Sequence, residues 1–210
     1  MTAAAIHLHR GDLPDGIRFA GAVAVDTETM GLKPERDRLC LVQLSAGDGT
    51  CHLVQVLKDR PAAGTPAPNL RALLTDGAVT KLFHFGRFDI AVLQRHLGVT
   101  CQPVYCTKIA SRLARTYTDR HGLKELCREL LGIDLSKEQQ SSDWGADSLS
   151  EEQCRYAAGD VAHLHALKAK LDVMLEREGR VELARACFDF LPHRAALDLA
   201  GWPDEDIFAY

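Results

Sequence analysis

Short apolar runs separated by turn-forming residues dominate the first half of the chain. Five of these runs are rich in aliphatic and β-branched residues, a composition typical of buried strands. The predicted strands are residues 20–28 (AGAVAVDTE), 39–47 (LCLVQLSAG), 50–56 (TCHLVQV), 80–85 (TKLFHF) and 104–107 (VYCT). The sequence Gly47-Asp48-Gly49 predicts a hairpin between the second and third strands. The residues before 20 are interpreted as a polar lead-in.

Apolar residues recur at helical spacing in the second half of the chain. Asn69 is the predicted N-cap of a first helix, and Ser150 and Gln153 have capping-box spacing at the start of a long one. The first predicted helix covers residues 69–76, and the second follows the fourth strand and carries Phe88, Ile90, Leu93 and Leu97. The third covers residues 107–114, and the fourth covers 122–132 and ends at Gly132. The last is a long helix from about residue 151. Early strands, crossover helices and late helices together predict an α/β layer protein.

Length, composition and charge limit the kind of protein. With 210 residues, of which 46% are hydrophobic, the chain fits one domain, or one domain with a helical extension. We expect a cytoplasmic protein, because no apolar run approaches the roughly 20 residues that span a bilayer, no signal-peptide pattern is present, and seven scattered cysteines form no CxxC pair. A net charge of −4 argues against coating long nucleic acids, but it does not exclude a short anionic substrate held by metal ions.

The first candidate site lies at the end of the first predicted strand. Asp26 and Glu28 are two residues apart, so both side chains leave the same face of the strand. Their repulsion and desolvation are unfavourable unless a cation lies between them, although a strand end that simply emerges into water would also explain the pair. Asp89 lies in the first turn of a predicted helix, where the helix dipole alone could favour an acid. His84 either belongs to the core or faces the same crevice.

Tyr156 and Asp160 lie four residues apart on the long predicted helix, so the phenol and the carboxylate share one face. That face continues to Leu164 and Leu167, and no Lys or Arg lies one turn from the acid. A buried acid needs a partner. If the four acids converge at one end of the sheet, their hard oxygen ligands would select Mg²⁺ or Mn²⁺, and two such ions about 3.5–4 Å apart would clamp a phosphoryl centre.

Three short motifs, each ending in or containing one of the acids discussed above, follow one another along the chain. They are DTET at 26–29, HFGRFD ending at Asp89, and YAAGD at 156–160. In this order they resemble the three exonuclease motifs of the DEDDy 3′–5′ exonucleases, and SKEQQSSDW (136–144) resembles the element before the third motif in the ribonuclease D-like branch. The resemblance implies a ribonuclease H-like exonuclease fold of the α/β class, with a mixed central sheet flanked by helices and a helical C-terminal half.

The resemblance covers about residues 20–175, so we expect one exonuclease domain over 1–210 with a helical C-terminal extension over 176–210. The sequence stops about 50 residues after Asp160, and no C-terminal HRDC-like domain is expected. A narrower resemblance, carried by HFGRFD, CTKIASRLARTYTDRHGLKEL and ACFDFLPHRAALDLAGW, is to the nanoRNase C (NrnC) group of short bacterial ribonuclease D-like enzymes that clear very short RNAs. That group implies a ring-like homo-oligomer, an octamer.

Site roles follow from the resemblance. It implies that Asp26, Glu28 and Asp160 ligate two divalent cations, with Asp26 bridging, and that Asp89 acts mainly through metal-bound water. Tyr156 would orient the water that attacks the scissile phosphate, and the products would be 5′-mononucleotides. The implied activity is metal-dependent 3′–5′ exoribonuclease hydrolysis of short oligoribonucleotides, especially dinucleotides, with Mg²⁺ or Mn²⁺.

Candidate substrate-binding residues surround these motifs. Leu32, after the Gly31 turn, matches the apolar wedge that such enzymes push between the last two bases, and Met30 could share that task; a loop leucine folded back on the core is the alternative. Lys and Arg exceed acids by three between 107 and 131, which fits either a solvated helix face or a terminal-phosphate site. The other candidates are Thr27, His84, Phe85, Arg87, Lys108, Arg112, Tyr117, Arg120, His121, Lys124, Gln140 and Trp144.

Two other functions remain open at this point. One is a ribonuclease D-like exonuclease that trims longer RNA or degrades DNA by the same chemistry. The other is a catalytically inactive exonuclease fold that only binds nucleic acid, although all four acids and the tyrosine are present. Apolar residues in the C-terminal stretch AALDLAGWPDEDIFAY predict packing on the parent domain or on a neighbouring subunit.

Overall fold

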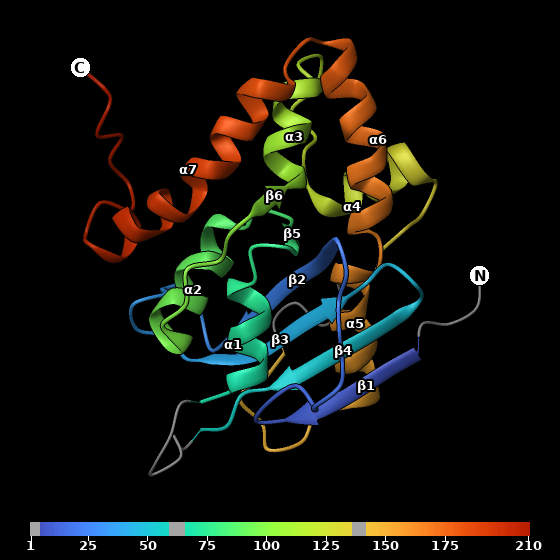
Figure 1. Cartoon of the computed structure of the whole chain (residues 1–210), viewed down its shortest axis with the longest axis vertical. Helices are drawn as coiled ribbons and strands as arrows, with labels where there is room; N and C mark the ends of the chain where they lie inside the picture. Colours follow the sequence, from blue (N-terminus) through green and yellow to red (C-terminus); the bar gives the residue numbers. More distant parts are fainter. Residues whose placement is uncertain (1–4, 59–65, 136–141) are drawn as a thin grey trace.

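A single sheet of six strands forms the centre of the fold, and helices lie on its two sides (Figure 1). The computed structural model describes residues 5–58, 66–135 and 142–210. The strands are β1 (Ala5–Arg10), β2 (Ala22–Thr29), β3 (Leu39–Ser45), β4 (Thr50–Gln55), β5 (Thr80–Phe83) and β6 (Val104–Cys106). Their order across the sheet is β1-β4-β3-β2-β5-β6.

The helices described are α1 (Pro68–Thr75), α2 (Arg87–Leu97), α3 (Thr107–Ala114), α4 (Leu123–Leu126), α5 (Glu151–Ala162), α6 (Leu164–Arg177) and α7 (Val181–Leu199). A short π-helical turn, η1 (Cys127–Leu131), continues α4. Helix α5 packs across β1, β3, β4 and β2, and α7 packs against α2, α3 and β6. No helix in the described residues is both long and apolar enough to cross a membrane.

Strand β2 lies in the interior of the sheet, where it positions the motif acids. It pairs antiparallel with β3 and parallel with β5. Every residue of β3 is buried, and Val23, Ala24 and Val25 of β2 are inaccessible to solvent, because layers cover both faces of these strands. In the β2–β3 register Asp26 lies opposite Gln43. The apolar half of β2 therefore anchors a strand end that carries two acids.

The mixed sheet, the flanking helices and the helical C-terminal half agree with the ribonuclease H-like class expected from the motifs. All five predicted strands are confirmed, and so is the hairpin, in which Gly47 and Gly49 have positive φ angles of 77° and 88°. The polar lead-in is wrong in part, because β1 pairs in parallel with β4. Most residues of this edge strand are exposed, and its apolar face is limited to Ile6, which packs against the core, and the exposed Leu8.

Two helix boundaries differ from the sequence prediction. Asn69 is not the N-cap of α1; the Asp12 carboxylate accepts hydrogen bonds from the backbone N–H groups of Asn69 and Leu70, both at 2.9 Å. A cap supplied from so far away leaves no local signal. The long helix from about 151 is divided at His163 into α5 and α6, whereas the capping box of Ser150 and Gln153 is confirmed.

Candidate active site

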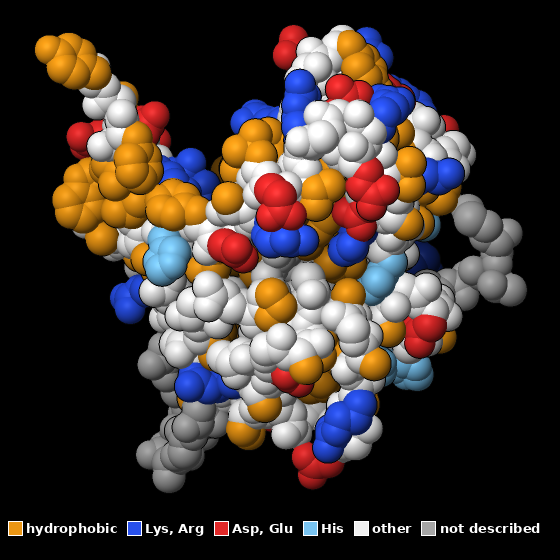
Figure 2. All heavy atoms as spheres, turned by 45° about the horizontal axis from the view of Figure 1, so that its top comes forward, with side chains coloured by type: hydrophobic (Ala, Val, Ile, Leu, Met, Phe, Trp, Pro, Cys, Tyr) orange, Lys and Arg blue, Asp and Glu red, His pale blue; other side chains and the backbone are white. Residues whose placement is uncertain are grey.

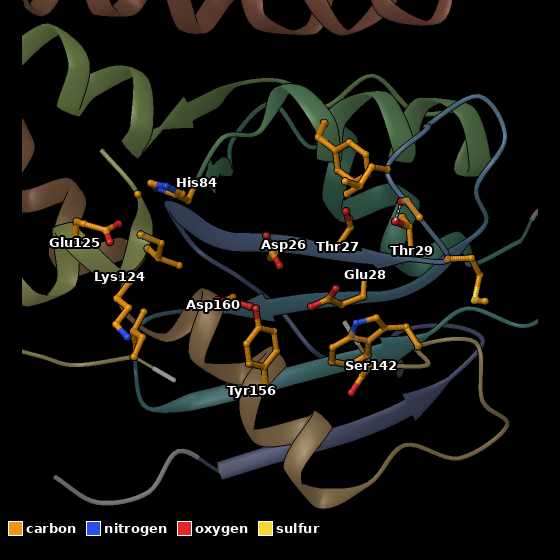
Figure 3. A pocket seen from close by; sticks show the side chains of 18 residues that line it. Asp26, Thr27, Glu28, Thr29, His84, Lys124, Glu125, Ser142, Tyr156 and Asp160 are labelled. Atoms are coloured by element: carbon orange, nitrogen blue, oxygen red, sulfur yellow. Dashed lines mark hydrogen bonds between the residues drawn. The ribbon is translucent and has the colours of Figure 1, made fainter. Parts of the chain in front are cut away.

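Strand β2 and helix α5 bring three acids together (Figure 3). Asp26 and Glu28 leave the face of β2 that α5 crosses, and Asp160 comes from α5 itself. One carboxylate oxygen from each of the three lies within 4.8 Å of the other two. The side chains point toward one another, with the Tyr156 ring beside Asp160. The structure thus joins residues that are more than a hundred positions apart in the sequence.

Asp89, the fourth acid, is held differently. It is buried in the first turn of α2, and its Oδ1 accepts a 2.6 Å hydrogen bond from the Thr27 hydroxyl. Thr27 points away from Asp26 and Glu28 in Figure 3, as the alternation along a strand requires. Asp89 is therefore fixed beside the three-acid group without belonging to it.

Burial and mutual repulsion make the charged form of this cluster costly. Desolvation, followed by the charges of Asp89, Asp160 and Glu28, raises the pKa of Asp26 well above its ordinary value. Desolvation and the charges of Asp160 and Asp89 raise the pKa of Glu28 to about 9. Without positive charge, the site therefore favours protonated carboxyls at neutral pH.

The other titratable groups of the site follow the same trend. Burial raises the pKa of Asp89 to about 7. Burial and the charge of Asp89 raise the pKa of Asp160 to about 7, although a hydrogen bond from Tyr156 opposes that rise. Burial and the charge of Asp160 raise the pKa of the Tyr156 phenol, so it stays protonated at neutral pH.

The donor set fits a hard divalent cation. Asp26, Glu28 and Asp160 offer carboxylate oxygens, which suit Mg²⁺ and Mn²⁺ and not a thiolate-preferring ion. Bound positive charge would also remove the repulsion that raises the pKa values of Asp26 and Glu28. The amide Nε2 of Gln43 donates a 3.3 Å hydrogen bond to Oδ2 of Asp26, which leaves Oδ1 without that restraint.

A cavity of about 590 Å³ opens over the acids. The turn after β2 contributes Met30 and Leu32, whose exposed fractions are 54% and 86%. The wall also includes Lys124 and the buried Trp144, whose ring centroid lies 6.1 Å from that of Tyr156. Leu32 does not fold back on the core, so the cavity has an exposed apolar side chain at its edge.

His84 lines the cavity from the end of β5. Its Nδ1 lies 2.9 Å from the Thr107 hydroxyl, which also lies 3.2 Å from the Phe83 carbonyl. When the hydroxyl donates to that carbonyl, it accepts from Nδ1–H, and Nε2 of His84 is then an acceptor. Burial, aided by the charge of Lys108, lowers the pKa of His84 to about 3, so the ring is neutral.

The exposed Phe85 and the half-buried Lys108 form a pair next to His84. Phe85 has a positive φ of 65°, which is rare for a bulky residue and places its ring in solvent. The Lys108 ammonium lies 4.1 Å from the centre of that ring. Neither residue is part of the cavity wall described above, although both flank the histidine that is.

The basic segment 112–124 is divided between the cavity and the surface. Lys124 lines the cavity, whereas Arg112, Tyr117 and Arg120 are exposed outside its wall. His121 Nδ1 lies 2.8 Å from the Ser111 hydroxyl, so that ring is tied to α3. The buried guanidinium of Arg115 donates a 2.9 Å hydrogen bond to the Arg120 carbonyl and pairs with Glu129, which fixes the loop between α3 and α4.

Two other sequence candidates lie away from the acids or outside the described chain. Arg87 forms a bidentate pair with Asp198 of α7, at 2.6 and 2.7 Å, and does not line the cavity. Gln140 falls outside the described residues.

Sequence reasoning missed several residues of the site. Gln43 and Phe88 touch or line it, and so do Glu125 and Ser142. Gln43 could have been found, because a polar residue in a run of buried aliphatic ones must have a partner and β3 follows β2 directly. Glu125 gave no such signal, because it is one of several charges on an amphipathic segment.

Comparison with known proteins gives one family. Residues 13–176 match the family model described as a 3′-5′ exonuclease. The ribonuclease D of Gluconacetobacter diazotrophicus is 36% identical over 160 residues, which cover 76% of this chain and 39% of that protein. The chain thus spans about two fifths of the length of this curated relative.

Two solved structures of Brucella melitensis NrnC match along nearly the whole length. The structure bound to pGG is 57% identical with a TM-score of 0.92, and the match covers 99% of each chain. The structure with bound Mg²⁺ is 56% identical with a TM-score of 0.91, covering 98% of this chain and 99% of that one.

Proposed function

The chain belongs to the 3′–5′ exonuclease family, in the ribonuclease D-like group that includes NrnC, and we propose that it hydrolyses short oligoribonucleotides, dinucleotides above all, to 5′-mononucleotides. The observation that carries this proposal is the meeting of Asp26, Glu28 and Asp160 oxygens within 4.8 Å, beside Tyr156 and beneath an open cavity. Acids in this arrangement suit phosphodiester hydrolysis, because the reaction gathers negative charge that cations must balance.

Members of this family use divalent metal ions, and we propose two, Mg²⁺ or Mn²⁺, at the carboxylate group. Asp26, Glu28 and Asp160 would hold them directly, with Asp26 shared between the two ions. When bound, such ions supply the positive charge that activates water and stabilises the reacting phosphate. The Brucella melitensis NrnC structure with Mg²⁺ supports the metal class.

Two neutral side chains orient the acids. Gln43 holds one oxygen of Asp26, and Thr27 holds one oxygen of Asp89. Each contact restrains one oxygen of the carboxylate. Asp89 lies outside the three-acid group, which supports a role through water and not as a direct ligand.

Tyr156 is the residue proposed to aim the attacking water. Its phenol stays protonated, so it can both donate and accept a hydrogen bond. The water oxygen forms a bond to phosphorus as the bond to the 3′-oxygen of the preceding nucleotide breaks. That 3′-oxygen takes up a proton, and the terminal residue leaves with its 5′-phosphate.

The cavity walls supply the contacts for bases and sugars. Leu32 and Met30 would pack against the terminal bases, since they are exposed and apolar at the cavity edge. The acceptor Nε2 of His84 suits a ribose hydroxyl. Trp144 would support the Tyr156 side of the cavity.

A short substrate is favoured by the size and charge of the cavity. Its volume of about 590 Å³ lies in the range of about 300–1,000 Å³ that encloses a small ligand. Of the described residues in its wall, Lys124 alone is a Lys or Arg, so the wall itself offers little positive charge to a long anionic strand. The likeness to NrnC, which was solved with pGG, supports the same length class.

The remaining basic and aromatic candidates would act at the far end of the substrate. We propose that the 5′-terminal phosphate is held by Lys108 with Phe85, by Arg112 of α3 and by the following loop with Tyr117, Arg120 and His121. Arg87 is assigned instead to holding the C-terminal helix α7, because its guanidinium pairs with the Asp198 carboxylate.

We also propose one exonuclease domain with an extension over 176–210 that mediates self-association into a homo-oligomer, an octameric ring. Figure 2 shows hydrophobic side chains gathered where α7 and the C-terminal tail lie. The exposed residues there are Phe190, Trp202, Ile207, Phe208 and Tyr210. All seven cysteines are unpaired, which supports action in a reducing compartment, the cytoplasm.

The direct test is product analysis with purified protein and a 5′-labelled RNA dinucleotide. With Mg²⁺ or Mn²⁺ we expect mononucleotides, and with a chelator none. Asp26→Asn should lose activity by about a thousandfold or more, since a bridging ligand is removed. The matched control is Asp189→Asn on the exposed face of α7. Full activity of the Asp26 variant would reject the assigned site.

A further inference from the structure

Three histidines gather on two adjacent strands at the edge of the sheet. His7 and His9 are two residues apart on β1, so they share one face, and His52 of β4 is the direct pairing partner of His7. His52 in turn lies opposite Leu44, and Leu44 lies opposite Val25. Val25 and Asp26 point to opposite faces, so the histidines lie on the face of the sheet away from the carboxylates.

The imidazole rings are close and nearly parallel. The His52 ring centroid lies 5.3 Å from that of His7 and 5.3 Å from that of His9, with interplanar angles of 22° and 18°. His9 Nε2 lies 3.0 Å from His52 Nδ1. Two nitrogens at that separation can either share a proton or bind one cation at about 2.0–2.1 Å each.

The surroundings keep these rings available as ligands. Phe19 packs edge-on against His52 at 6.0 Å between centroids, which restrains that ring from one side. Burial lowers the pKa of His9 and of His52, and the neighbouring histidines lower both further. Neutral imidazole is the form that coordinates metals. Three neighbouring rings that can each become cationic are unfavourable for folding. A bound metal cation that takes the place of their protons would offset this cost.

We propose that His7, His9 and His52 form a second metal site, for a divalent transition cation of the imidazole-preferring class of Zn²⁺, Ni²⁺ and Cu²⁺. Among the described residues, only Asp26, Glu28 and Asp160 place three ligand atoms within 4.8 Å of one another. The three histidines do not reach that spacing as they stand, but His9 and His52, with nitrogens 3.0 Å apart, would provide the first two ligands. The exposed His7 ring must turn about its side-chain bonds to become the third.

Such an ion would link β1 to β4, because its ligands come from both strands. The strand β1 is an edge strand with mostly exposed side chains, so it buries little apolar surface of its own. A cation shared by both strands stabilises their pairing in the folded chain only, and folding stability then rises with metal concentration. The chemistry differs from that of the carboxylate site, because Mg²⁺ prefers oxygen ligands and gains little from imidazole.

Electron paramagnetic resonance of bound Cu²⁺ tests the site with untagged full-length protein. Excess Mg²⁺ is present to occupy the carboxylates. We expect nitrogen hyperfine structure from one tightly bound equivalent of Cu²⁺. His52→Ala should weaken that binding by about a hundredfold, because a chelating ligand is lost. The matched control His193→Ala, an exposed histidine on α7, should leave it unchanged.

Thermal unfolding with Zn²⁺ gives an independent readout. The melting temperature of the parent protein and of the His193 variant should rise with Zn²⁺, whereas that of the His52 variant should not. Both variants should keep the magnesium-dependent nuclease activity, which shows that they fold. Equal nitrogen signals in the His52 variant and the parent, or oxygen-only coordination in the parent, would overturn the proposal.

Discussion

The hydroxyl of Thr27 donates a 2.6 Å hydrogen bond to Oδ1 of Asp89, joining β2 to the first turn of α2. The two residues are 62 positions apart, and the bond is buried. It leaves Asp26 and Glu28 on one face of the strand while Thr27 holds the fourth acid from the other. The DTET motif therefore has two roles. Asp26 and Glu28 belong to the three-acid group, and Thr27 positions Asp89.

Replacing Thr27 with valine keeps the shape of the side chain and removes this donor. A hydrogen bond to a charged group contributes about 1.5–3 kcal/mol, so kcat/KM should fall by about tenfold or more. The Thr27→Ser variant, which retains the hydroxyl, should stay close to the parent. Steady-state kinetics on a dinucleotide measures both. Equal rates for the valine and serine variants would show that the bond does not position Asp89 for the reaction.

The stability of the metal-free protein should depend on pH through the acids. Folding raises the pKa of Glu28 from 4.5 to about 9 and that of Asp160 from 3.8 to about 7. The folded state then binds more protons than the unfolded chain between these values, so this contribution to stability is lost as pH rises through them. Mg²⁺ binds the ionised form, and its stabilising effect should grow over the same window.

Calorimetry with Mg²⁺ and with chelator measures this effect. We expect the gain in melting temperature from Mg²⁺ to be larger by about 5 °C near pH 9 than near pH 5. Glu28→Gln cannot ionise at this position and should reduce the difference. A gain that is the same at both pH values would contradict a cation site formed by these carboxylates.

Leu32 should matter for substrate binding and not for folding. Its side chain is 86% exposed at the cavity edge, so Leu32→Ala removes little buried surface from the free protein. Against a stacked base the lost contact is about 1–2 kcal/mol, which predicts a rise in KM of about tenfold with an unchanged melting temperature. The control is Leu183→Ala on α7, a leucine that is 54% exposed. A similar KM in both variants would remove Leu32 from the base contacts.

The C-terminal tail, residues 200–210, should be required for self-association of the chain. Phe190 and Phe208 contact each other edge-on, with ring centroids 5.9 Å apart, yet both remain exposed in the single chain. Deleting residues 200–210, or changing Ile207 and Phe208 to serine, should lower the molar mass measured by light scattering. Val173→Ser, at an exposed apolar position on α6, is the control. An unchanged mass in the tail variants would contradict this role.

The sequence was informative wherever the signal is local and periodic. The apolar run before Asp26, the capping box at Ser150 and the spacing of Tyr156 and Asp160 each depend on neighbouring residues, and the structure agrees with them. Motif order then placed the acids of β2 and α5 in one site. No distance between those elements follows from the sequence, because it is set by the packing of α5 across the sheet.

The parts that sequence reasoning missed depend on long-range contacts. Strand β1 is stabilised by a partner more than forty residues away, and the amides at the start of α1 are capped by Asp12. Arg87 lies in the HFGRFD motif and is a substrate-binding candidate from the sequence, but its guanidinium pairs with Asp198 of α7. Gln43 is recognisable in the sequence as a buried polar residue that needs a partner, but its pairing with Asp26 follows only from the β2–β3 register.

The most direct test of the proposed function is a length series. The value of kcat/KM is measured for 5′-labelled RNAs of two to about ten nucleotides with Mg²⁺, with Mn²⁺ and with chelator, beside the Asp26→Asn variant. A small cavity over a carboxylate metal site predicts metal-dependent release of 5′-mononucleotides, fastest for the dinucleotide and absent in the variant. Rates that rise with RNA length, or activity that survives the Asp26 change, would contradict it.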